Sequence, residues 1–161
     1  MILGIDPGLS GALAFMDSHD LLIYDIPTLQ IERNGKSKRQ IDLQHLLADL
    51  KRWPVSHCYL EMLGTRPGQN SSAVAQTGRG YGQIEMGLAA CNIPVTYVAP
   101  QVWKKALQVP KDKDGARARA SQLLPQWAHN WPLKGHHNRA EAALLSLYGF
   151  QKRTRNLSTP G

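Results

Sequence analysis

The first 27 residues alternate between short apolar runs and turn-forming segments. The apolar runs cover residues 2–6, 11–17 and 21–27, and the sequences PGLSG and SHD separate them. Runs of this length with such boundaries predict β-strands. Because the connections are too short for a helical crossover, we expect the three strands to be antiparallel neighbours.

A basic segment, residues 28–40, comes next and is rich in residues that interrupt helices. Asn34 and Gly35 at its centre form a strong signal for a type I′ turn. The basic residues around this turn are Arg33, Lys36, Lys38 and Arg39. The pattern predicts an exposed basic finger.

Helical spacing of apolar residues dominates the rest of the chain. Asp42 can cap a helix whose leucines recur over residues 43–50, and a Trp-Pro pair ends it. Ser71 or Ser72 can cap a second helix that reaches about Cys91. Further strands are predicted over 57–62 and 95–99, and further helices over 101–107, 115–124 and 138–148.

The resulting element order is βββαβαβααα. Three antiparallel strands, followed by strands reached through helical crossovers, predict an α/β fold with a five-stranded mixed sheet flanked by helices. This is the strand order of the ribonuclease-H-like fold. The chain has no internal repeat, so we expect a single domain over residues 1–150 and a basic polar tail over 151–161.

Length and composition narrow the function classes. The 161 residues suit one domain, and 19 Lys and Arg against 12 Asp and Glu give a net charge of +7. Two cysteines fit a reducing compartment, and neither a long apolar run nor a signal-peptide pattern is present. We therefore expect a cytoplasmic protein without a membrane partner, in the host cytoplasm if the gene is viral. The basic excess favours a polyanionic partner, although a solvated basic surface would give the same count.

Three acidic residues stand at positions where acids need an explanation. Asp6 ends the first predicted strand, although Asp-Pro-Gly taken alone is typical of a turn. Glu61 lies near the end of an apolar strand, where a charge needs a partner, a metal ion or an exposed tip. Glu141 lies beside the apolar stripe of the last helix, and taken alone it is typical of a solvated helix acid. The predicted topology can bring all three acids to one end of the sheet.

Three carboxylates at one place would repel one another and destabilise the fold. A hard divalent cation removes this conflict, and oxygen ligands suit Mg²⁺ or Mn²⁺. A pair of such ions can activate water and stabilise the leaving oxygen in phosphodiester cleavage. If these acids hold metal, nine acids remain against 19 basic residues, so an acidic pocket would lie within a strongly basic surface.

The sequence resembles the RuvC-type Holliday junction resolvases, and most of all their bacteriophage-type branch. The likeness is carried by ILGIDPGLSGALAF, by the long segment from LEMLGTRPGQN to VPKDKD, and by HHNRAEAALLSLYG, so it covers residues 2–149. The resemblance implies a homodimeric, magnesium-dependent crossover junction endodeoxyribonuclease of DNA recombination and repair, which nicks two strands symmetrically. It also implies that Asp6, Glu61 and Glu141 are the acidic catalytic positions.

The chain departs from the bacterial members of this family in its last motif and in one loop. Those members carry Asp where this chain has Glu141, and Asp or His where it has Asn138. Asn138 can complete the catalytic site only as a neutral, weaker ligand, and His137 is the alternative on the same helix face. Gly64 replaces an aromatic residue linked to junction handling, which puts cleavage by the bacterial sequence rule in doubt.

Basic residues outside the acidic motifs predict a surface that tracks phosphates. Trp103 within this region is more typical of a packing residue than of a base-stacking one. Small residues from Ala75 to Ala89 form a stripe on the second helix, which either packs on its own sheet or, as the resemblance favours, forms a dimer interface. The candidate DNA contacts are Lys104, Lys105, Lys111, Lys113, Arg117, Arg79, Lys36 and Lys38.

Three alternative functions share some of these features. The enzyme could cut other branched DNA or structured RNA, or the chain could be a junction-binding module without catalysis. DPGLSG superficially resembles the phosphate loop of actin-like ATPases, but 161 residues supply only one of the two halves that those proteins need. We expect no nucleotide cofactor, because the glycines at 78–82 do not form a dinucleotide fingerprint, and no zinc site.

Overall fold

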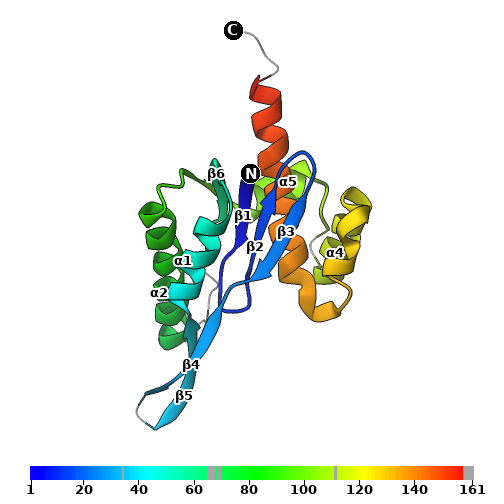
Figure 1. Cartoon of the computed structure of the whole chain (residues 1–161). Coiled ribbons are helices and arrows are strands. Elements are labelled where there is room, and N and C mark those ends of the chain that lie inside the picture. The colour runs from blue at the N-terminus through cyan, green and yellow to red at the C-terminus, as the bar shows by residue number, and fades with distance from the viewer. Residues whose placement is uncertain (34, 65–67, 69, 111, 158–161) are drawn as a thin grey trace.

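A five-stranded mixed sheet forms the centre of the protein in the computed structural model, which describes residues 1–33, 35–64, 68, 70–110 and 112–157. The strand order is β3-β2-β1-β6-β7 (Figure 1). β1 pairs antiparallel with β2 and parallel with β6, so the predicted mixed sheet is confirmed. The strands are β1 (Ile2–Asp6), β2 (Ala12–Met16), β3 (Leu21–Asp25), β6 (His57–Glu61) and β7 (Val95–Val98).

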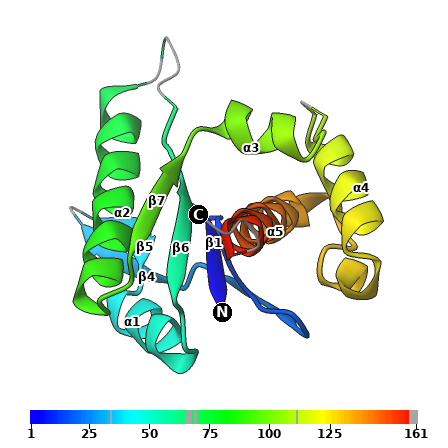
Figure 2. The same cartoon turned by 90° about the horizontal axis from the view of Figure 1, so that it is seen from above.

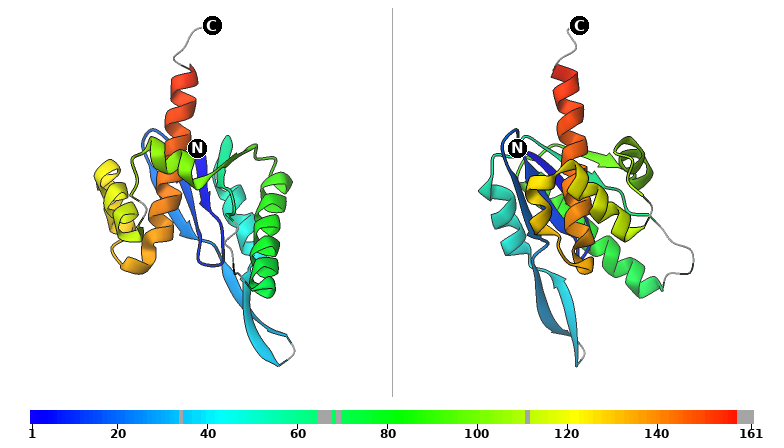
Figure 3. Two further views of the ribbon diagram at one scale, coloured as in Figure 1. Left: turned by 180° about the vertical axis from the view of Figure 1, so that it is seen from behind. Right: turned by 90° about the vertical axis from the view of Figure 1, so that its right-hand side faces the viewer.

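The basic segment forms a separate two-stranded hairpin. Its strands β4 (Thr28–Arg33) and β5 (Lys36–Ile41) pair antiparallel along their whole length. Figure 3 shows the hairpin projecting from the body of the protein beside one end of α2 (Ser71–Ala90). The predicted basic finger is therefore confirmed, while Asn34 of the predicted turn lies outside the described residues.

Helices cover both faces of the sheet. Figure 2 shows α1 (Leu43–Arg52) and α2 on one side, and α4 (Lys113–Leu123) and α5 (His137–Leu157) on the other. The short helix α3 (Pro100–Ala106) lies on the path from β7 to α4. Two 3₁₀ turns, η1 (Pro125–Asn130) and η2 (Lys134–His136), join α4 to α5. Within the described residues, no helix has both the length and the apolar character that a membrane span requires.

Two of the predicted helix boundaries are wrong. α2 is capped by the Asn70 side chain, which accepts a hydrogen bond from the Ser72 N–H at 2.9 Å, and not by either predicted serine. Asn in an extended conformation caps as well as serine does. α5 does not end at Tyr148 but continues to Leu157, because Phe150 still packs against the core. The cap predicted for α1 is correct, since Asp42 accepts from the His45 N–H at 3.1 Å.

Side chains of successive strand residues pack on opposite faces of the sheet, as the two-residue period requires. Leu3 and Leu60 belong to the apolar cluster under α1 and α2. Ile2 and Tyr59 belong to the cluster with α5. Between them Gly4 lets α5 approach the sheet, because a Cβ at this position would lie 2.5 Å from the carbonyl oxygen of Ala142. The helix that carries Glu141 and Asn138 is therefore seated directly on the strand that carries Asp6.

Candidate active site

Asp6 and Glu61 end two neighbouring parallel strands. Ile5 pairs with Leu60 in the register of β1 and β6, and the two acids are the next residues in each strand. Adjacent parallel strands lie about 4.8 Å apart, so the two backbones hold these acids side by side. Side chains alternate between the two faces of the sheet along each strand. Asp6 and Glu61 fall on the same alternate positions as Gly4, so their side chains belong to the face that α5 covers.

The first turns of α5 lie at the same end of the sheet. Glu141 directly precedes Ala142, whose carbonyl oxygen faces Gly4. One turn earlier, the Asn138 amide nitrogen donates a hydrogen bond to the carbonyl oxygen of Ser10, in the loop that follows β1. Asn138 is thus tied to the loop that begins at Asp6, while its role as a ligand stays a prediction. The ring nitrogen Nδ1 of His137 lies 3.4 Å from the Lys134 carbonyl oxygen, so this nitrogen contacts the preceding turn η2.

Glu61 is a largely buried carboxylate with a specific partner. Its Oε2 accepts a hydrogen bond of 2.7 Å from the indole N–H of Trp103, which is fully buried. Burial raises the pKa of Glu61; the Trp103 hydrogen bond opposes this rise, the Glu141 charge adds to it, and the Lys104 charge opposes it. The interaction with Glu141 shows that two of the three predicted acids share one electrostatic environment.

Lys104 supplies the positive charge at this acidic pair. Its ammonium Nζ lies 2.6 Å from Oε1 of Glu141 and 5.2 Å from the centre of the Trp103 ring. Both side chains of the ion pair are mostly covered, with 26% of Lys104 and 14% of Glu141 exposed. Consecutive residues of α3 therefore contact the two glutamates: Trp103 holds Glu61 and Lys104 neutralises Glu141. The predicted packing role of Trp103 is confirmed, but its link to an acid was not foreseen.

The chemistry of these acids fits a hard divalent cation. Carboxylate oxygens from a strand end and a helix are suitable ligands for Mg²⁺ or Mn²⁺, and Lys104 shows that a cation is already favourable at Glu141. As the side chains are placed, no group of three or more His, Cys, Asp or Glu among the described residues is arranged to hold a metal ion. The three-acid metal site therefore stays a prediction, and Lys104 contacts only Oε1 of Glu141.

Two arginines that were not among the predicted site residues position the parts of the site. Arg139 makes a paired contact with Asp25 at the end of β3, at 2.6 Å from Nε to Oδ1 and 2.5 Å from Nη2 to Oδ2. This contact fixes the start of α5 against the sheet. Arg39 of β5 donates through Nη2 to the carbonyl oxygen of Leu9 and to the Ser10 hydroxyl, both at 2.7 Å, and so holds the loop after Asp6. The sequence offered only the position of each arginine as a signal: Arg139 follows Asn138, and Arg39 lies in the basic finger.

The predicted DNA contacts are spread over three regions. Lys104 lies at the acids, whereas Lys105 is exposed on the same helix. Arg117 is half-buried and donates to the Trp131 carbonyl oxygen at 3.3 Å, so it also ties α4 to the following loop. Lys36, Lys38 and Arg79 lie on or opposite the hairpin. Lys111 is outside the described residues, and the structure describes only the backbone of Lys113.

Comparison with known proteins finds similarity at the level of the fold. No protein-family model and no curated protein matches the sequence. Among solved structures, that of Thermus thermophilus RuvC has 18% identity and a TM-score of 0.58, with 96% of each chain covered. T. thermophilus RuvC in complex with a Holliday junction substrate has 16% identity and a TM-score of 0.61, with 95% of each chain covered. The chain therefore has a RuvC-like, ribonuclease-H-like fold, as predicted.

Proposed function

We propose that this chain is a metal-dependent endonuclease that resolves four-way DNA junctions by paired symmetric nicks. The observation that carries the proposal is that two consecutive residues of α3, Trp103 and Lys104, contact Glu61 and Glu141 next to the strand end that bears Asp6. The supporting comparison is a fold similar, over 95% of the chain, to T. thermophilus RuvC, which was solved in complex with a Holliday junction substrate.

In this proposal Asp6, Glu61 and Glu141 hold Mg²⁺, or Mn²⁺, and the bound metal supplies activation of water and stabilisation of the leaving oxygen. The Trp103 N–H fixes one oxygen of Glu61 and leaves Oε1 for ligation. Asn138 donates through its amide nitrogen, which leaves its amide oxygen as a neutral ligand. If bound metal displaced the Lys104 ammonium from Glu141, that ammonium would be available to a phosphate of the DNA.

Paired nicks require two such sites, so we also propose a homodimer. A single nuclease domain over residues 1–150 supplies one set of acids. The exposed side of α2 supports this proposal, because Val74 and Met86 are 45% and 68% exposed next to the small residues Gly78 and Gly82. The sequence likeness favours the bacteriophage-type branch, with a role in DNA recombination and repair in the cytoplasm.

A second candidate keeps the chemistry and widens the substrates to other branched DNA or to structured RNA. It is favoured by Gly64, which occupies the position of a junction-handling aromatic residue. A Cβ at Gly64 would meet no atom within 4 Å, so among the described residues no neighbouring side chain takes the place of the missing aromatic ring. Competition among junction, flap, duplex and RNA substrates separates the two candidates, since a resolvase prefers the junction.

The proposal is tested by incubating the protein with a labelled four-way junction and Mg²⁺ or Mn²⁺. We expect cleavage that Asp6→Asn, Glu61→Gln and Glu141→Gln abolish while junction binding remains. Asp20→Asn is the matched control, because Asp20 is an exposed acid in the turn at the opposite end of the sheet. Binding by the unmodified protein without metal-dependent cleavage would instead identify a junction-binding module, and normal cleavage by Glu61→Gln would refute the proposed site.

A further inference from the structure

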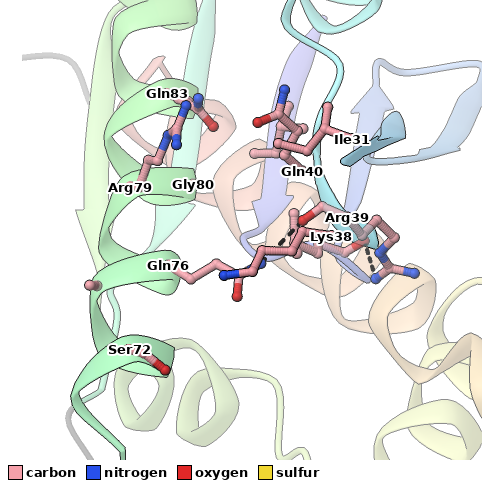
Figure 4. Close-up of a pocket in the computed structure, with 12 residues that line it drawn as sticks. Ile31, Lys38, Arg39, Gln40, Ser72, Gln76, Arg79, Gly80 and Gln83 are labelled. Atoms are coloured by element: carbon pink, nitrogen blue, oxygen red, sulfur yellow. Dashed lines mark hydrogen bonds between the residues drawn. The ribbon is translucent and has the colours of Figure 1, made fainter. Parts of the chain in front are cut away.

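A polar groove lies between the β4–β5 hairpin and α2. Its cavity volume is about 280 Å³, and Figure 4 shows Gln76, Arg79 and Gln83 on the helix opposite Lys38 and Gln40 of the hairpin. The groove is built into the fold, because the Gln76 amide donates to the Arg39 carbonyl oxygen at 3.1 Å and so ties the hairpin to the helix.

The lining of this groove is basic and rich in hydrogen-bond donors. Lys38, Arg39 and Arg79 contribute three positive charges, and the polar lining includes the amides of Gln76 and Gln83. No acidic residue lines the groove, and no described residue forms an ion pair with Lys38 or Arg79. Fixed positive charge without a protein counterion favours an anionic ligand, and the amides can donate to its oxygens.

The groove borders the loop that follows Asp6. Leu9 lines the groove, and Arg39 bonds to Leu9 and Ser10, in the loop that begins at Asp6. The same Ser10 accepts the hydrogen bond from Asn138 of α5. One loop thus joins the groove to the residues proposed for cleavage.

We propose that this groove binds the phosphodiester backbone of a DNA arm as it leaves the cleavage site, with Lys38 and Arg79 on the phosphates. The inference rests on the proposed function for the identity of the substrate, but its residues are separate from the acids. Arg79 lies three residues after Gln76, which is nearly one helical turn, so both residues face the groove. Gly82 follows Arg79 by three residues, so the dimer face proposed for α2 borders the groove.

The experiment measures binding of a labelled four-way junction in EDTA, where no cleavage occurs, over a series of salt concentrations. The variants are Lys38→Ala, Arg79→Ala and the double variant. Lys51→Ala, an exposed lysine near the end of α1, is the matched control. Each lost phosphate contact lowers the slope of log affinity against log salt by about 0.9 for duplex DNA. We expect a decrease of about 1.8 in the double variant, with affinity roughly tenfold weaker per contact, and little change in Lys51→Ala.

The outcomes separate the groove from the proposed function. An unchanged affinity and slope in a folded double variant would overturn the groove, even if the unmodified protein cleaves junctions. Loss of slope in the double variant without any cleavage by the unmodified protein would support the groove and reject the proposed nuclease. Groove-dependent binding of RNA but not DNA would overturn the assignment to DNA, and absence of any nucleic-acid binding would overturn both proposals.

Discussion

Gly4 is the residue at which the sheet and the helix of the active site meet most closely. A Cβ at Gly4 would lie 2.5 Å from the Ala142 carbonyl oxygen and 2.9 Å from the Ser146 Cα, both backbone atoms of α5. The backbone nitrogen of Ser146 would lie closer still, and because ordinary van der Waals contact begins at 3.4 Å, Gly4→Ala must move α5 or β1 by about 1 Å. Backbone cannot rotate out of the way as a side chain can, so the two elements must separate.

This separation has two expected effects. Overpacking of this kind costs about 1 to 3 kcal/mol in the free energy of unfolding. The displacement also carries Glu141 away from Asp6 and Glu61, and a misplacement of about 1 Å can lower a catalytic rate by roughly 100-fold. We therefore expect Gly4→Ala to fold with reduced stability and to bind junctions through its unchanged surface while cleaving them far more slowly.

Urea denaturation measures the first effect, and single-turnover cleavage at saturating protein measures the second. Gly135→Ala is the control, because a Cβ there would meet no atom within 4 Å. If Gly4→Ala is as stable as the unmodified protein, the contact between β1 and α5 at Gly4 is not as close as described. If the variant is destabilised but cleaves at the normal rate, the claim that this contact positions Glu141 is wrong.

Charge changes around the site give three further expected outcomes. Burial raises the pKa of Glu61, so the stability linked to its protonated form is present below the ordinary value of 4.5 and is lost as the pH rises through the raised value. Glu61→Gln should thus raise the melting temperature in EDTA at alkaline pH but not below pH 4.5, and equal shifts at both would contradict this. Lys104→Met leaves the two glutamates without a cation, so we expect a lower melting temperature in EDTA and a larger increase on adding Mg²⁺; an increase no larger than in the unmodified protein would count against the site. The Arg139 hydrogen bond holds the pKa of Asp25 below its ordinary value of 3.8, so the stabilisation is present above that value and is lost as the pH falls through the lower one. Because Asp25 is 60% exposed, solvent screening limits the expected cost of Asp25→Asn to about 1 kcal/mol at neutral pH, which urea denaturation can measure and which should vanish in acid.

Much of the fold was predictable because its strands are short, apolar and separated by clear turns. The first three strands and the crossovers to β6 and β7 appear where the pattern places them. The end of α5 was not predictable, because Gly149 and the polar residues after it are typical of a helix terminus. In the structure Gly149 is instead a point of close packing, where a Cβ would collide with the Tyr59 ring.

The candidate site was predictable only in part. The adjacency of Asp6 and Glu61 is a property of the topology, since neighbouring parallel strands bring their carboxyl ends to one edge. The contact from Trp103 to Glu61 joins residues 42 positions apart and depends on the path of α3. No local sequence pattern predicts such a contact, and a tryptophan at that position predicts only a core residue. The groove beside the hairpin likewise depends on how β5 and α2 are placed in space.

The most direct test of the account is to map the nicks on a mobile four-way junction at nucleotide resolution, in Mg²⁺ and with Glu61→Gln as the inactive reference. A resolvase site built on Asp6, Glu61 and Glu141 should give two nicks at equivalent positions on opposing strands, which yield ligatable duplexes and disappear in Glu61→Gln. Nicks that are unpaired, that occur equally on a linear duplex, or that persist in Glu61→Gln would contradict it.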